Sequence, residues 1–281
     1  MSSPDGQLAT LPEQVLGLAG AYVRHNDLLT HHALSAPTSA DQLTAPRNSS
    51  RTLAAHTLGQ LARLGIQRRR HPVEIPESFA RLRQLHWLTS AAFDTLDRLH
   101  GELSIATGAL RPPPFGRTPP DPVPLDEVLK DAATGIAIAR DLTAHAPADL
   151  TACARALAAV VHHHVPAAPP PPDIQRAAAE ADVLHAVACG LVALPESPGT
   201  GHANSPVRVP LQEVRALEEQ GLVQSVRIPG PRPGLAAPSR VHLTGRGCAH
   251  LAAAFARSRT TSLTGTPAAV PRPAADAVRS R

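Results

Sequence analysis

Proline-rich runs constrain this chain most, because proline lacks a backbone N–H and clashes with the preceding turn of a helix. The sequence holds 30 prolines, and dense runs of them occupy 111–124 and 166–172. Such runs favour extended, semi-rigid connections, so they divide the chain into three parts. A PxxP stretch can also bind grooves lined by aromatic residues, but the spacer interpretation is favoured because nothing in the sequence implies such a partner.

A mainly α-helical fold is predicted, because aromatic residues make up only 2% of the chain and the core must be built from Ala, Leu, Val and Ile. The three cysteines are odd in number and form no CxxC pair, which favours a reducing compartment and argues against a disulfide framework or a thiolate metal site. The longest apolar stretch, 186–194, is too short to cross a bilayer. We therefore expect a cytoplasmic protein without a membrane partner.

Five helices are predicted before residue 166. They cover Pro12 to about Leu34, a segment capped by Ser49 or Ser50 and ending near Gly65, then 79–103, 125–142 and 150–161. The last two are expected to form an antiparallel hairpin. Together they predict a helical bundle over 11–165, interrupted by a proline-rich insertion at 111–124.

The third of these helices carries the clearest pattern. Apolar residues recur at alternating spacings of three and four, which predicts a seam that packs against another helix in a bundle or in a homodimer. For the homodimer, the residues predicted to mediate self-association are Leu82, Leu85, Leu96, Leu99 and Leu103.

The chain after the second proline run is predicted to contain helices and a β-hairpin. Asp173 is placed to cap a helix that reaches about Leu194, and a short amphipathic helix follows at 211–220. Two strands at 222–228 and 240–243 then form a hairpin with a long Pro/Gly-rich tip, and a final helix covers 248–257. Residues 258–281 are expected to be a disordered basic tail.

The hairpin half of this part resembles winged-helix transcriptional regulators of the MarR and PadR kind. In those proteins a helix ending L-x-x-x-G-L-V precedes the wing, and the return strand ends V-x-L-T-x-x-G. The matching residues are Leu217, Gly221, Leu222, Val223, Val241, Leu243, Thr244 and Gly247. The resemblance implies a winged-helix-like module over 173–257. It also implies a DNA-binding regulator.

Arginines near the predicted wing are the candidate DNA contacts, because guanidinium groups bind phosphate oxygens and can enter the minor groove. They are Arg208, Arg215, Arg227, Arg232 and Arg240. The net charge of +4 lies in the tail, since residues 1–172 hold 15 basic and 15 acidic side chains and residues 173–256 hold 7 of each. The balanced charge keeps open an alternative, a protein-interaction or scaffold protein that uses the winged helix as a docking unit.

Two further clusters have structural and functional interpretations. Arg63, Arg68, Arg69 and Arg70 follow or end a helix, where cations are stabilised by the helix dipole, but three consecutive arginines also suit a phosphate-binding role. The histidine runs 31–32 and 162–164 consist of consecutive residues, which on a helix point about 100° apart and cannot converge on one ion. No metal or cofactor is expected. No catalytic motif is present, so the chain is expected not to be an enzyme.

Overall fold

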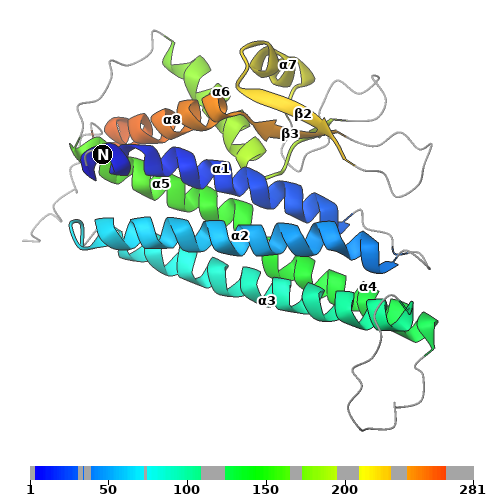
Figure 1. Ribbon diagram of the computed structural model, residues 1–281. Helices are drawn as coiled ribbons and strands as arrows, with labels where there is room; N and C mark the ends of the chain where they lie inside the picture. The colour runs from blue at the N-terminus through cyan, green and yellow to red at the C-terminus, as the bar shows by residue number, and fades with distance from the viewer. Residues whose placement is uncertain are drawn as a thin grey trace, which may run out of the picture.

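The computed structural model describes residues 4–30, 34, 39–72, 75–108, 124–164, 173–194, 209–228 and 239–263. Within these residues the fold is mainly helical, as predicted, with a small antiparallel sheet of three strands (Figure 1). The elements are α1 Pro4–Thr30, α2 Ser39–Arg68, α3 Pro76–Ala106, α4 Leu125–Thr143, α5 Ala146–His164, α6 Ile174–Ala188, β1 Ala193–Leu194, α7 Leu211–Glu219, β2 Val223–Arg227, β3 Ser239–Leu243 and α8 Gly245–Leu263.

The first five helices form an elongated bundle in which α2 and α3 pack along each other (Figure 1). α1 packs against α2 on one side and against α5 and α8 on the other, while α4 covers the second half of α3. The apolar residues separate into a larger cluster around α1 and α5 and a smaller one where α3 and α4 meet. The predicted helical bundle is therefore confirmed.

Two helices begin earlier than the sequence predicted. α1 begins at Pro4 rather than Pro12, and α2 begins at Ser39 rather than at a cap formed by Ser49 or Ser50. Pro12 and Pro46 both lie inside these helices and are buried. Apolar burial here outweighs the backbone hydrogen bond that each proline removes, whereas the local rule places proline at the start of a helix or outside it.

The leucine seam of α3 faces the chain's own core. Its predicted positions are buried at the predicted spacing, and α3 packs against α2, α4 and α5. The exposed fraction is 3% or less at each of the five residues expected to mediate self-association, Leu82, Leu85, Leu96, Leu99 and Leu103. Self-association through these residues is therefore wrong for this fold, because no part of the seam is left to contact a second copy.

The predicted antiparallel hairpin of the fourth and fifth helices is also wrong. α4 packs against α3 and α1, whereas α5 packs against α1 and α8, and the two do not pack along each other. Only Ala144 and His145 separate them, and the backbone of Ala144 stays helical at φ −56 and ψ −40. Ala144 thus continues the helical conformation of α4.

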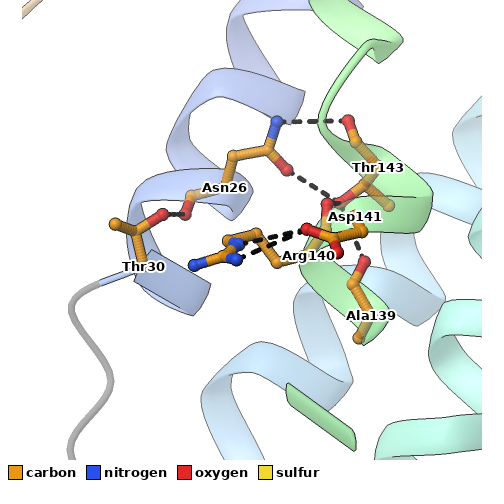
Figure 2. Close-up of polar contacts among 6 residues, drawn as sticks. All are labelled: Asn26, Thr30, Ala139, Arg140, Asp141 and Thr143. Atoms are coloured by element: carbon orange, nitrogen blue, oxygen red, sulfur yellow. Dashed lines mark hydrogen bonds and ion pairs between the residues drawn. The ribbon is translucent and has the colours of Figure 1, made fainter. Parts of the chain in front are cut away.

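Polar side chains of α1 join it to α2, α3 and α4. The buried Tyr22 hydroxyl lies 2.9 Å from the Thr57 hydroxyl of α2 and 2.6 Å from the Thr89 hydroxyl of α3. The Asn26 amide donates to the Thr143 carbonyl at 3.1 Å, and the Thr143 hydroxyl donates to Asn26 Oδ1 at 2.8 Å (Figure 2). These hydrogen bonds satisfy polar groups that would otherwise be costly to bury, and they determine how the helices align.

The C-terminal elements share the core of the bundle. One apolar cluster runs without interruption from Leu8 and Leu16 of α1 through Leu157 of α5 to Val214 of α7 and Phe255 of α8. The sequence placed a module boundary between 165 and 173, but the packing joins both sides into one apolar core. α8 continues to Leu263, and residues 264–281 lie outside the described residues, as do 109–123 and 165–172.

Candidate functional site

The short helix α7 lies on the outside of the molecule above the hairpin (Figure 1). Val214 and Leu217 point into the core, as their spacing predicted, and the exposed face carries Gln212, Glu213 and Arg215. Pro210 precedes the helix in an extended conformation, where its fixed φ and missing N–H cost nothing. An amphipathic helix with two buried side chains presents most of its surface to solvent.

Gly221 ends α7 in the left-handed conformation, with φ +70. Its N–H donates to the Glu218 carbonyl and the N–H of Leu222 donates to the Leu217 carbonyl, both at 2.9 Å. This pair of bonds is the Schellman motif, which favours glycine because a side chain is strained at positive φ. The L-x-x-x-G-L-V pattern of the sequence therefore corresponds to a helix end that turns the chain directly into β2.

The second pattern, V-x-L-T-x-x-G, closes the hairpin onto that helix end. β2 and β3 pair antiparallel from Val223 opposite Leu243 to Arg227 opposite Ser239. The Thr244 hydroxyl donates to the Gly221 carbonyl at 2.7 Å and accepts from the Gly247 N–H at 3.1 Å, which caps α8. A side chain at Gly247 would meet the Leu222 carbonyl oxygen at 2.0 Å. The two patterns thus contact each other.

β3 is the central strand of the sheet. The strand order is β1-β3-β2, with Ala193 of β1 opposite Arg240. The helix predicted from the sequence reaches about Leu194, so β1 was not predicted. α6 instead ends at a second Schellman turn, in which Gly190 has φ +73, and an added Cβ there would lie 2.8 Å from the Val23 side chain of α1. The predicted cap of α6 is confirmed, because Asp173 accepts from the Arg176 N–H.

The structure separates the five arginines expected to contact DNA. Arg215 on α7 and Arg227 at the end of β2 are exposed. Arg208 and Arg232 lie outside the described residues. Within the described part of the chain, neither Arg215 nor Arg227 forms an ion pair with a carboxylate. The charges of these two side chains are therefore not neutralised by a carboxylate of the described residues.

Arg240 does not fit its predicted role in binding DNA. Its Nη2 donates to Asp27 Oδ1 of α1 at 2.8 Å, its Nε approaches both carboxylate oxygens, and its Nη1 donates to the Gly190 carbonyl at 3.0 Å. The two charged side chains are 22% and 10% exposed. A bidentate contact of this kind uses the guanidinium fork, so Arg240 joins the sheet to the bundle instead of facing a nucleic acid.

Arg240→Ala is therefore expected to reduce stability by about 3 kcal/mol, because it removes the ion pair and the hydrogen bonds that the Asp27 carboxylate, only 10% exposed, receives from Arg240. Chemical unfolding of the variant and of Arg227→Ala measures this effect. Because Arg227 is exposed, its replacement should change stability by no more than about 0.5 kcal/mol. Equal stability of the two variants would contradict this role of Arg240.

Arg246 is an exposed basic residue that the sequence reasoning missed. It lies in the first turn of α8, between Thr244 and Gly247, inside the T-x-x-G pattern. A cation in the first turn of a helix is disfavoured by the helix dipole, so Arg246 does not serve to stabilise α8. A basic residue in the first turn of a predicted helix is the signal in the sequence that could have identified Arg246 as a candidate anion contact.

Acidic residues and a shallow groove distinguish α7 from the hairpin. Glu213 and Glu219 are exposed, and Glu218 accepts from the Ser225 hydroxyl of β2. Between α6 and α7 lies a groove of about 200 Å³. Its lining combines apolar and polar side chains, namely Ala179, Val183, Ala216 and Leu217 with Arg176, Glu180, Glu213 and Gln220. The groove therefore offers apolar surface together with side chains of both charges.

Two buried histidines lie beneath the sheet and along α1. His25 contacts the hydroxyls of Ser49 and Ser50, each at 3.1 Å, and burial lowers its pKa to about 4. The pKa of His242 on β3 is also lowered to about 4, first by burial and then by the charge of Arg24, while Asp27 acts in the opposite direction. Both rings are therefore neutral at pH 7. They belong to the link between α1, α2 and β3.

Metal sites, reactive thiols and helices that could span a membrane are other features that could indicate a function. Among the described residues, no group of three or more His, Cys, Asp or Glu side chains is placed to hold a metal ion. His31 and His32 lie outside the described residues, and Cys153 and Cys248 are buried thiols whose pKa values are raised to about 12 and about 11 by burial. No described helix is long and apolar enough to cross a membrane.

A cavity of about 390 Å³ lies between the end of α1 and α4. Most of its lining residues are apolar, and Arg140 is the charged one. Arg140 lies 3.4 Å from the carboxylate of Asp141 (Figure 2). The charge at this cavity is thus paired within the chain.

Comparisons with protein-family models, with curated proteins and with solved structures gave no significant match.

Proposed function

We propose that the elements from α6 to α8 form a winged-helix-like module and that the chain is a DNA-binding transcriptional regulator without enzymatic activity. Four features support the winged-helix interpretation. They are the order of helix, short strand, helix, hairpin and helix, the strand order β1-β3-β2, the exposed position of α7 before the hairpin, and the contact between the two sequence patterns at Gly221 and Thr244.

The observation that carries the DNA-binding proposal is the exposed charge of Arg215, Arg227 and Arg246, none of which pairs with a carboxylate of the described residues. Arg227 is the last residue of β2, at the base of the tip at 229–238, and basic residues on a wing can bind phosphates or the minor groove. Glu213 and Glu219 face solvent on α7 and would repel phosphates in the major groove. We therefore assign DNA contact to the hairpin and the basic tail, with α7 at the margin.

Binding of the full chain to a random DNA duplex is expected to weaken steeply as salt rises, because each neutralised phosphate releases counterions. Fluorescence anisotropy at several salt concentrations measures the slope of log K against log salt. Arg227→Ala combined with Arg246→Ala should lower the magnitude of that slope by about 0.9 for each phosphate that the variant no longer neutralises. The full chain is needed, because α8 packs against α1 and α5.

Arg51→Ala combined with Arg83→Ala is the matched control, because both residues are exposed on the bundle and the charge change is the same. Binding that does not depend on salt, or an unchanged slope in the hairpin variant, would contradict contact through the hairpin. In that case the groove between α6 and α7 favours the second candidate, a protein-docking function. The acidic surface of α7 suits a basic partner segment.

A further inference from the structure

A cavity of about 560 Å³ lies where α2 ends and α3 begins. It is lined by Ala62, Gly65, Ile66, Arg68, Arg69 and Phe79. This turn is at the end of the bundle that also carries the N-terminus of the chain, away from the β2–β3 hairpin (Figure 1). It contains the three consecutive arginines for which the sequence left a structural and a phosphate-binding interpretation open.

The backbone and one aromatic contact position these arginines. The N–H groups of Arg70 and His71 both donate to the Gln67 carbonyl at 2.9 Å, and the side chain of Gln67 is buried. The guanidinium carbon of Arg68 lies 4.9 Å from the centre of the Phe79 ring. This distance permits a cation–π interaction, which holds the Arg68 guanidinium over the ring, where its N–H groups can still donate to an anion.

The charge at this turn exceeds what the helix end requires. Within the described residues, neither Arg68 nor Arg69 nor Arg70 forms an ion pair with a carboxylate. The nearby Arg81 pairs with Glu77 at 2.7 Å. The C-terminal end of a helix carries only about half a negative charge, so it neutralises a fraction of one guanidinium. Most of the charge of the three arginines is therefore not neutralised by the described residues.

The cavity also has an apolar wall. Ile66 is 56% exposed there, and the ring of Phe79 is only partly buried. An inorganic ion would cover neither side chain, whereas a ligand with an apolar ring or chain would remove both from water. The volume falls in the range of sites that bind small organic molecules.

We propose that this cavity binds an organic anion. Its charged group, a carboxylate, sulfonate or phosphate, contacts Arg68 and Arg69, and its apolar part lies against Ile66 and Phe79. Guanidinium groups bind such oxygen anions in a planar, bidentate way. An arginine whose N–H groups were already paired with a carboxylate could not do so. The site is independent of the hairpin, so it stands whether or not the chain binds DNA.

The test uses the full chain and the fluorescent probe 8-anilinonaphthalene-1-sulfonate, an aromatic sulfonate. Saturable binding of one probe per chain is expected. Arg68→Gln combined with Arg69→Gln should weaken it by about tenfold or more, because two charge-assisted hydrogen bonds are lost. Arg51→Gln combined with Arg83→Gln removes the same charge from exposed positions of α2 and α3 and should leave the affinity within about twofold.

Competition separates the two parts of the proposal. Naphthalene-1-sulfonate should displace the probe at far lower concentration than methanesulfonate or inorganic phosphate. Ile66→Gln should bring the displacing concentrations of the two sulfonates closer together, because it removes part of the apolar wall. Probe binding that is absent, or equal in the Arg68/Arg69 variant and the parent chain, would overturn the site. Equal competition by methanesulfonate and naphthalene-1-sulfonate would overturn the apolar contact. Circular dichroism of each variant verifies that the fold is retained.

Discussion

Leu96→Ala is expected to reduce the free energy of unfolding by about 3–5 kcal/mol, the range of the costlier buried leucine truncations. Leu96 has no exposed surface and belongs to the apolar cluster shared by α3 and α4. The loss combines the transfer of the missing methyl groups with the cavity that they leave between long, rigid helices. Urea unfolding followed by circular dichroism measures it.

Leu99→Ala should have a cost of the same order. Leu99 packs against Gly135 so closely that a Cβ on the glycine would lie 2.5 Å from Leu99 Cδ1. The matched control is Leu58→Ala, because Leu58 is 50% exposed on α2 and little surface returns to water when it is truncated. A Leu96→Ala protein that kept its stability but changed its oligomeric state would contradict the assignment of this seam to the core.

Stability is expected to fall by about 4 kcal/mol in total between pH 7.5 and pH 5, about 2 kcal/mol from each of His25 and His242. Their pKa values in the folded chain are lowered to about 4, whereas an unfolded histidine titrates near its ordinary value of 6.5. Between these values the unfolded chain binds more protons than the folded one. Protonation therefore favours unfolding, and the stability is present above pH 6.5 and lost as the pH falls toward 4.

Denaturant unfolding at a series of pH values from 7.5 to 5 measures this loss, and the range stops above the ordinary pKa values of carboxyl groups. His25→Gln should remove about half of it, which leaves the contribution of His242 and a smaller one from His185, whose pKa is also lowered by burial. His56→Gln is the matched control, since His56 is exposed on α2. A parent chain whose stability is constant across this range would show that the two rings reach water when protonated.

The segment 22–27 of α1 connects the bundle to the proposed wing. Tyr22 contacts α2 and α3, His25 contacts α2, Asn26 contacts α4, and Asp27 contacts β3 through Arg240. A change in the position of α1 would therefore be transmitted to the central strand of the sheet. Because these contacts involve paired or neutral buried groups, they hold the hairpin in one orientation on the bundle.

Local patterns were sufficient for several features of this fold. The spacing of leucines predicted which face of α3 is buried, and Asp173 and Gly221 predicted where α6 begins and α7 ends. The hairpin strands were predicted to within two residues at each end. These features depend on neighbours within a few positions, through helical periodicity, capping and the conformational freedom of glycine, so the sequence carries them directly.

Other features depend on residues far apart in the chain, and only the tertiary structure decided them. Pro12 and Pro46 lie inside helices because packing stabilises those segments. α4 and α5 follow each other without reversing because each packs on a different neighbour.

Arg227 and Arg240 look equivalent in the sequence, but Asp27, 213 positions away, pairs with Arg240, whereas Arg227 pairs with no carboxylate of the described residues. The charge of a side chain is a property of the residue, whereas its availability to a ligand depends on what the fold places beside it.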